Sequence, residues 1–252
     1  MQQISGDRPE RPAGTPEPPW RTAPRRGRSV PRPQLSREVV VAAALKVVES
    51  AGGDALTMRR VADEIGVSAS ALYGYIANKE ELVQLVLEQI MAEMPLPGLE
   101  GGWQEMVRSW ARGARDVFRR HPGVAGLTLG RVPFGPNMLH GTELMLGVLR
   151  SAGIPDQVAA YAGDLGSLYV GAIAYEEEVT PLNAADDFAG QMVGWLKSLP
   201  ADQFPNTVAI ADKLVAGDAD QRFEWGLDVL IRGLESFLST PPGPEGHWPR
   251  SG

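Results

Sequence analysis

Cysteine is absent from this chain of 252 residues, and histidine occurs three times. Without cysteine there can be no disulfide framework, no thiolate metal site and no cysteine nucleophile. The sequence also lacks a Gly-rich phosphate loop with its lysine and a nucleophile elbow. No signal peptide is visible, because the first residues are rich in proline and arginine and contain no apolar segment. We therefore expect a cytoplasmic protein with no cofactor.

Long apolar runs are missing as well. The longest uncharged stretch of helical character runs from Leu165 to Tyr175, between Asp164 and the acidic run Glu176–Glu178. This stretch is too short to cross a bilayer, which needs about 20 apolar residues. The net charge of −7 argues against a general nucleic-acid binder. We expect a soluble chain with no membrane partner.

The two ends of the chain differ in composition from the part between them. Residues 1–34 contain eight prolines and seven arginines, and residues 240–252 contain four prolines. Such segments bury too little apolar surface to become ordered, so we expect a disordered Pro/Arg-rich arm over 1–34 and a disordered tail over 240–252.

Helical spacing of apolar residues recurs between these ends, whereas no period-two strand pattern stands out, which predicts an all-α fold. The segment from Pro95 to Gly98 interrupts the helices and predicts a boundary between domains at 35–94 and 95–239. Apart from two short helices between residues 57 and 74, the spacing predicts helices over residues 36–51, 79–94, 103–120, 126–131, 137–152, 156–179, 185–198, 207–216 and 220–239.

The two short helices are separated by a three-residue turn. Thr57 and Ser68 stand where each helix would begin, and their hydroxyl groups can cap it. Gly66 suits the left-handed residue that ends the first helix. Asn78 and Glu81 have the spacing of a capping box that opens the next helix. This is the pattern of a helix-turn-helix.

These residues resemble the DNA-binding domain of the tetracycline-repressor (TetR) family of transcription regulators. The similar segments are residues 35–38, 56–62, 65–68, 72–73 and 78–82. Residues 131–137 and 222–228 resemble the ligand-binding domain of the branch nearest the tetracycline repressor itself, so the resemblance covers residues 35–239. Tyr75 departs from the pattern, since many relatives carry histidine there.

The resemblance implies an N-terminal three-helix domain that contains the helix-turn-helix, and a larger helical domain for ligand binding and dimerisation. It also implies a homodimeric repressor that a small-molecule effector releases from a palindromic operator in double-stranded DNA. The effector, the operator sequence and the sign of regulation are not specified by the sequence.

The major groove of B-DNA accepts one α-helix, so the outward residues of the second short helix would meet base edges. We expect these to include Ser68, Ala69, Ser70 and Tyr73. Thr57 and the free amides beside it can hold a phosphate, with the cation of Arg59 nearby. Family precedent implies that Tyr73, Tyr75 and Lys79 touch phosphates, although Tyr73 could instead be a core aromatic.

The charge of the predicted DNA-binding domain allows two explanations of how it attracts DNA. Residues 35–94 hold five basic and nine acidic residues, so either a few well-placed cations suffice or the arm adds attraction. In the second case Arg28 and Arg32 would contact DNA.

Two helices of the second domain favour a dimer contact. The helix over 156–179 is rich in small residues, which let helices approach closely, and the last helix has a broad apolar face. The resemblance implies that these helices from two subunits form a four-helix interface. The expected interface residues are Gly163, Gly166, Leu227, Leu230, Ile231 and Leu234.

Apolar and aromatic side chains of the second domain are suited to a ligand pocket between helices. The candidates are Trp110, Phe118, Phe134, Met138, Met145, Tyr169 and Trp195. If these residues only fill a core, the protein is a DNA-binding scaffold without a ligand.

An enzyme is the competing class of function. His140 has Glu143 three residues on, a spacing that can hold a metal or form an acid–base pair. His121 stands at a helix end and His247 in the tail. Because a pair of neighbours on a helix is commonplace, we expect no catalytic residue and no metal site.

Overall fold

The structure, a computed structural model, describes residues 35–96, 101–131, 135–179 and 188–238. Contacts divide the chain into two units, Met1–Leu35 and Ser36–Gly252. Within the described residues there are twelve α-helices and one 3-10 helix, and no strand. The predicted all-α class is therefore confirmed. The arm over 1–34 and the tail over 240–252 lie outside the described residues, as do Arg28, Arg32 and His247.

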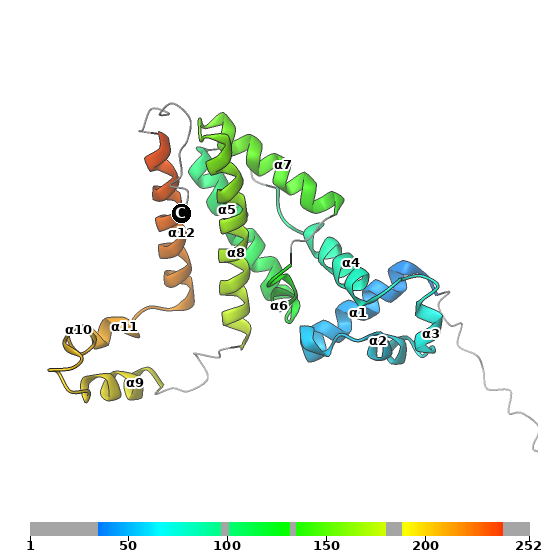
Figure 1. Ribbon diagram of the computed structural model, residues 1–252, viewed down its shortest axis with the longest axis horizontal. Coiled ribbons are helices and arrows are strands. Elements are labelled where there is room, and N and C mark those ends of the chain that lie inside the picture. Colours follow the sequence, from blue (N-terminus) through cyan, green and yellow to red (C-terminus); the bar gives the residue numbers. More distant parts are fainter. Residues whose placement is uncertain (1–34, 97–100, 132–134, 180–187, 239–252) are drawn as a thin grey trace, which may run out of the picture. The chain divides into compact units, whose positions relative to one another are not determined.

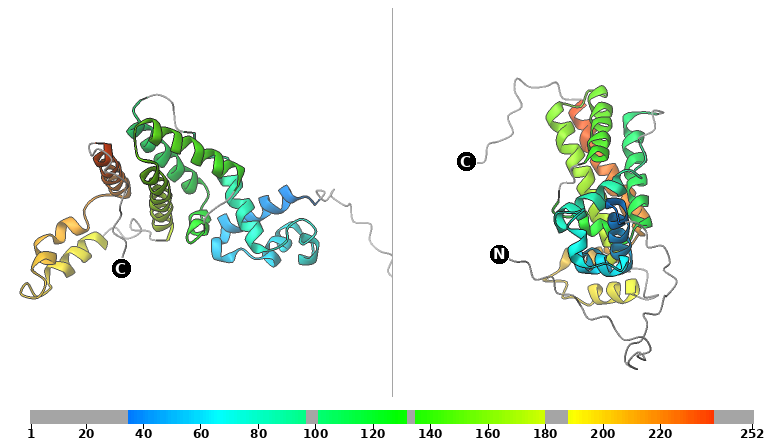
Figure 2. Two further views of the ribbon diagram at one scale, coloured as in Figure 1. Left: turned by 45° about the horizontal axis from the view of Figure 1, so that its top comes forward. Right: turned by 90° about the vertical axis from the view of Figure 1, so that its right-hand side faces the viewer.

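The first four helices form one cluster (Figures 1 and 2). Helix α1 (Arg37–Ala51) packs against α2 (Met58–Ile65) and α4 (Lys79–Met91), and α2 packs against α3 (Ala69–Leu72). The 3-10 helix η1 (Gly53–Ala55) follows α1. The Ser36 hydroxyl accepts a hydrogen bond from the Val39 amide at 3.3 Å, which begins α1. The core of this cluster consists of fully buried aliphatic side chains, among them Val40, Val48, Leu56, Val61, Leu72, Ile76, Leu82, Val86 and Ile90.

The remaining helices are α5 (Trp103–Arg120), α6 (Val124–Thr128), α7 (Pro136–Ser151), α8 (Asp156–Val179), α9 (Phe188–Lys197), α10 (Pro205–Ala209), α11 (Ala211–Leu214) and α12 (Ala219–Leu238). Helix α8 packs against α5, α6, α7 and α12, and α5 also contacts α7 and α12. Helix α9 contacts α10 and α11. The predicted bounds of α5 and α8 are confirmed.

Three predicted helices differ from the observed ones. Helix α4 ends at Met91 rather than at residue 94, and α6 begins earlier, at Val124. The helix predicted over 207–216 is two short helices, α10 and α11. They are separated at Ile210, whose φ of −115° and ψ of 17° lie outside the helical region. Proline at the first position of α10 starts that helix before the predicted residue.

A ladder of ion pairs joins α5 to α12. Four arginines spaced one helical turn apart on α5 face three carboxylates spaced one turn apart on α12. The residue numbers rise on α5 as they fall on α12, so the two helices are antiparallel. The ladder consists of Arg108–Asp228, Arg112–Glu224 at 2.7 Å, and Arg115 and Arg119, each 2.9 Å from Asp220.

Candidate functional site

The local geometry of α2, the turn and α3 follows the sequence prediction closely. The Thr57 hydroxyl accepts a hydrogen bond from the Arg60 amide at 3.2 Å and so caps α2. Gly66 ends α2 in the left-handed conformation, with φ of 78°. The Val67 amide then donates to the Ala62 carbonyl at 3.0 Å, which turns the chain toward α3. Both predicted features, the cap and the glycine turn, are confirmed.

Two predicted caps are formed differently. Ser68 precedes α3, but its side chain makes no capping hydrogen bond, because its hydroxyl lies 2.9 Å from that of Ser70. Asn78 accepts a hydrogen bond from the Glu81 amide at 2.8 Å, as expected of a capping box. The Glu81 carboxylate, however, accepts from the Ala77 amide at 2.6 Å, one residue before Asn78. Glu81 also pairs with Arg37 at the start of α1.

Polar groups that point to solvent surround α3. Thr57, Arg59, Ser68 and Ser70 are exposed, and Ala69 and Lys79 are half-buried. The side chain of Tyr73 is 56% exposed and that of Tyr75 is 42% exposed. Tyr73 is therefore not a core aromatic, which removes the alternative interpretation of that residue. The face of α3 turned away from its own core thus carries hydroxyl groups and one methyl group rather than charges.

An apolar cavity of about 290 Å³ lies between α5, α8 and α12. Trp110 and Tyr169, two of the predicted ligand residues, line it. The Tyr169 hydroxyl donates to the Phe223 carbonyl at 2.8 Å, and the two rings stack 5.7 Å apart. Burial raises the pKa of Tyr169 above its usual value, an effect that the nearby Arg115 opposes. The other lining residues are almost all aliphatic or aromatic, for example Val107, Leu165, Leu227, Leu230, Leu234 and Phe237.

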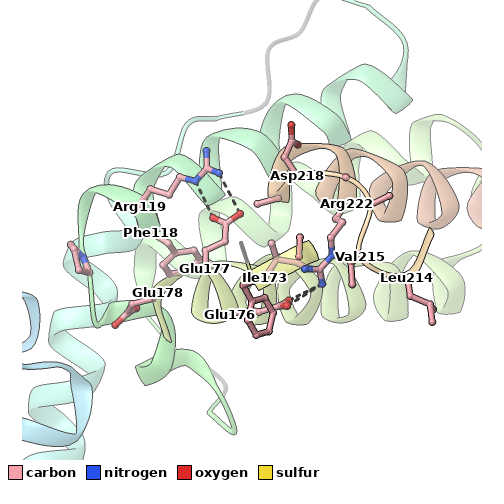
Figure 3. Close-up of a pocket in the computed structure, with 17 residues that line it drawn as sticks. Phe118, Arg119, Ile173, Glu176, Glu177, Glu178, Leu214, Val215, Asp218 and Arg222 are labelled. Atoms are coloured by element: carbon pink, nitrogen blue, oxygen red, sulfur yellow. Dashed lines mark hydrogen bonds and ion pairs between the residues drawn. The ribbon is translucent and has the colours of Figure 1, made fainter. Parts of the chain in front are cut away.

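A second, larger cavity of about 1070 Å³ lies by the carboxyl ends of α5 and α8 and the start of α12 (Figure 3). Phe118 forms part of its wall. Both of its arginines pair with carboxylates, Arg119 with Glu177 at 3.0 Å and Arg222 with Glu176 at 3.0 Å, and Glu178 and Asp218 also line it. Because both arginines already form ion pairs, neither is free to bind an anionic ligand.

Of the predicted ligand residues, the structure brings only Trp110 and Tyr169 together among those that it describes. Met145 belongs to a buried core cluster with Leu149, Ile154 and Ala159. Met138 lies half-buried on α7, and the side chain of Trp195 on α9 is 58% exposed and lines neither cavity. Phe134 lies outside the described residues. The sequence pattern could not separate these sites, because aromatic residues occupy cavity walls, cores and surfaces alike.

The predicted dimer residues are also divided. Leu227 and Ile231 are 3% and 1% exposed, so both are buried within this chain and cannot offer a free face. A side chain at Gly166 would approach Trp110, 3.8 Å away, in the apolar cavity. Leu230 and Leu234 line the same cavity half-buried. Gly163 alone of the two glycines has open space beside it, with nothing within 4 Å.

Large apolar side chains are also exposed on the same two helices, and Tyr161, Leu165 and Val229 among them line the mouth of the apolar cavity. They are Tyr161, Leu165 and Leu168 on α8, and Trp225 and Val229 on α12, and Trp225 is the most exposed, at 72%. Two of the predicted interface residues, Leu227 and Ile231, face the chain's own core, and a subunit contact on α8 and α12 stays a prediction. The sequence does contain a sign of an exposed apolar side chain on α12, since Trp225 lies outside the apolar register of Phe223, Leu227 and Ile231.

Among the described residues no three His, Cys, Asp or Glu side chains lie close enough to hold a metal ion. None of the described helices is both long and apolar enough to cross a membrane. His140 and Glu143 are both exposed on α7.

A capped helix, a glycine turn and a second helix with an exposed polar face define a helix-turn-helix protein, a class that binds double-stranded DNA. Residues 40–86 match the family described as bacterial regulatory proteins, tetR family, and residues 94–238 match the tetracyclin repressor-like C-terminal domain. The chain belongs to the tetracycline-repressor (TetR) family, whose members are transcription regulators that bind operators and small-molecule effectors and dimerise.

Relatives and solved structures agree with this family. The HTH-type transcriptional repressor DrrR1 of Streptomyces coeruleorubidus is 30% identical over 233 residues, which span 89% of this chain and 86% of that protein. The tetracycline repressor protein class A from transposon 1721 of Escherichia coli is 29% identical over 223 residues, spanning 87% and 98%. The structure of ActR from Streptomyces coelicolor in complex with actinorhodin is 39% identical, covers 81% of this chain and 97% of its own, and has a TM-score of 0.73. This protein is therefore a DNA-binding transcription regulator.

Proposed function

We propose that this regulator is a homodimeric repressor whose α3 helices enter successive major grooves of a palindromic operator, and that a small-molecule effector releases it. The observation that carries this proposal is the exposed, uncharged polar face of α3 behind a well-packed α1–α4 core. Residues 35–94 would form the DNA-binding domain and residues 95–239 the effector and dimer domain. A repressor of this kind acts where the chromosome lies, so a cytoplasmic location is part of the proposal, and a catalytic role is not.

The proposed DNA contacts divide by type. Ser68, Ala69 and Ser70 would meet base edges, since hydroxyl groups can donate or accept and a methyl group packs on thymine. Phosphates would be held by Thr57, Arg59, Tyr73, Tyr75 and Lys79, and by Arg28 and Arg32 of the arm. The exposed strip of α8 and α12 that carries Leu168 and Trp225 would be covered by the second subunit.

The operator is the first thing to determine. The purified chain is incubated with a random-sequence DNA pool, and the retained duplexes are sequenced. We expect an inverted repeat whose half-site centres are about one helical turn, 34–36 Å, or a multiple of it apart. Retention of DNA without any common sequence, or without symmetry, would contradict a dimer with two recognition helices.

Lys79 provides a test of phosphate contact. Replacing Lys79 with alanine removes a cation beside α3 while leaving the Asn78 cap intact, so the fold should be kept. We expect weaker binding of the selected duplex and a salt dependence reduced by about two units of slope in log Kd against log salt, one for each subunit of the dimer. Lys213→Ala on α11 is the matched control and should leave the slope unchanged. Equal slopes for both variants would remove Lys79 from the interface.

The apolar cavity between α5, α8 and α12 is the proposed effector site. Its walls carry aromatic rings from Trp110, Tyr161 and Tyr169 and no charged side chain. A buried charge without a partner is costly, so this cavity favours an uncharged, flat apolar molecule over an ion. The larger cavity beside Arg119 and Arg222 is less suited to an uncharged apolar molecule, because two arginines and four carboxylates line it.

Gly166 allows this site to be filled from within. Leucine at position 166 would project toward Trp110 and occupy the space of a ligand, since an added Cβ already lies 3.8 Å from that ring. With neutral anthraquinone as the probe, we expect quenching of tryptophan fluorescence in the parent and at least about tenfold weaker binding in Gly166→Leu, a change of about 1.4 kcal/mol. Binding of the selected duplex should be retained.

The control for this experiment is Gly147→Leu on α7. An added side chain there has nothing within 4 Å, so it gives the same gain in helix propensity without filling a cavity. If Gly166→Leu and Gly147→Leu bind the probe equally well, the effector does not lie between α5, α8 and α12.

A further inference from the structure

His121 joins three helices at the boundary between the two halves of the described chain. It follows the last residue of α5, and its side chain is 14% exposed. Its Nδ1 lies 2.7 Å from Glu49 on α1, and its Nε2 lies 3.0 Å from Glu93, two residues after α4. One imidazole ring therefore connects the end of α5 to both the first and the fourth helix.

Both contacts require a particular protonation state. An ionised carboxylate only accepts hydrogen bonds, so each ring nitrogen must carry a proton, and the ring must be an imidazolium. Burial lowers the pKa of His121, but the hydrogen bonds to Glu49 and Glu93 raise it by more, and the pKa lies above its usual value of 6.5. Arg120, 3.7 Å from Glu93, is the other charged group at this contact, and α6 contains no titratable residue.

The contacts around His121 do not depend on a proton. A side chain at Gly53 of η1 would meet Leu127 of α6 at 2.9 Å, and one at Gly123 would meet the Val48 carbonyl at 2.5 Å. These close approaches show that η1 and α1 pack directly on α6 and on the turn over residues 121–123 that joins α5 to α6, the α5–α6 corner. The imidazolium adds a titratable link to that packed corner.

We propose that His121 is a positioning residue. Its protonated ring links Glu49 on α1 and Glu93 after α4 to the end of α5, a three-way contact called the clasp below, and so fixes the orientation of the helix-turn-helix relative to the effector domain. Proton binding and this arrangement are then linked, because a movement that separates either glutamate from the ring weakens proton binding. The inference rests on the proposed operator-binding function.

The direction of the effect follows from the raised pKa. The clasp stabilises the arrangement fully below the unfolded pKa of about 6.5, and the stabilisation is lost as the pH rises through the folded pKa. With the clasp open, the two helix-turn-helix units are held less firmly, and ordering them on DNA costs free energy. Operator affinity should therefore fall as the pH rises.

The experiment measures Kd for the duplex selected from the random pool between pH 6 and pH 8.5 at constant ionic strength. We expect wild-type affinity to fall at least about fivefold across this range, the lower end of typical coupling between two linked sites. His121→Gln should show a flat profile. Glu93→Gln, which removes one carboxylate, should move the midpoint to lower pH. The melting temperatures of wild type and His121→Gln should differ most at pH 6 and converge at high pH.

His140→Gln on α7 is the matched control and should follow the wild-type profile. Parallel profiles for wild type and His121→Gln would overturn the proposal, and so would a His121-dependent rise in affinity with pH. Failure of every protein to bind the selected duplex at any pH would instead contradict the operator-binding function. If His121→Gln is poorly folded, the shift of midpoint in Glu93→Gln decides the question.

Discussion

Arg115→Met is expected to lower the free energy of unfolding by about 3 kcal/mol, the lower part of the range for breaking a buried ion pair. The Arg115 side chain is 6% exposed and donates to Glu177 on α8, whose side chain is 17% exposed. Its guanidinium also lies 4.4 Å from the centre of the Phe223 ring. Methionine fills similar volume but leaves Glu177 with less compensation for its burial. The measurement is urea unfolding at pH 7, and the melting temperature should fall by roughly 6–12 °C.

The size of this effect depends on what remains beside Glu177. Burial raises the pKa of Glu177, but hydrogen bonds from Arg115 and Arg119 lower it by more, so the carboxylate is ionised at neutral pH. Arg119 still reaches it at 3.0 Å in the variant, which limits the loss. Asp220, 69% exposed, adds little because water screens it.

Arg112→Met is the matched control on the same helix. Arg112 pairs with Glu224 at 2.7 Å, but its side chain is 46% exposed, so the pair should contribute at most about 1 kcal/mol. Equal destabilisation by the two substitutions would show that burial does not decide the energy of the ladder between α5 and α12. A loss below about 1 kcal/mol for Arg115→Met would lead to the same conclusion.

The α5–α12 ladder also shows which contacts the sequence does not reveal. Arginines at 108, 112, 115 and 119 are typical of a solvated face of α5, because arginine is seldom buried alone. Arg115 is nevertheless buried, since Phe223 covers its planar group and Glu177 satisfies it from a third helix. The carboxylates at 220, 224 and 228 have the same spacing, yet nothing local in either segment indicates that the two rows meet.

Local features are predictable where short-range chemistry decides them. Thr57, Gly66 and Asn78 act within three or four residues of their partners, and each is confirmed as a cap, although the Glu81 carboxylate accepts from Ala77 rather than from Asn78. The prediction for Ser68 is wrong, because its hydroxyl has two possible partners nearby, a backbone amide and the Ser70 hydroxyl. The α10–α11 break at Ile210 escapes prediction for a related reason, since helical spacing continues through it while the backbone does not.

The cavity and the subunit face require knowledge of neighbours far apart in sequence. The sequence places Gly166 at a contact between subunits, because a glycine inside a helix indicates close approach. The close group is instead Trp110 of the same chain. Periodicity identifies which residues of α8 share a face, but it does not identify which helix or subunit packs against that face. Contacts between α5, α8 and α12 decide this, and these helices are separated by long stretches of sequence.

Ser70→Glu should abolish specific operator binding while leaving the fold intact. Ser70 is exposed on α3, and a carboxylate near a helix N-terminus is favourable for the helix. On DNA the same carboxylate would face phosphates and base edges from both subunits, and like charges brought together at an interface cost several kcal/mol. We expect at least about 100-fold weaker binding of the selected duplex, equivalent to about 2.7 kcal/mol.

Ser109→Glu on α5 separates local repulsion from total charge. Ser109 is exposed and lies outside the helix-turn-helix, and the substitution changes the net charge of −7 by the same amount. Affinity in this control should change less than about twofold, because distant exposed charges are screened beyond about 10 Å at 0.1 M salt. Equal losses in the two variants would mean that overall charge, not contact with α3, governs binding. Retained affinity in Ser70→Glu for the duplex selected with the parent protein, with an unchanged circular dichroism spectrum, would mean that α3 does not enter the groove at this position.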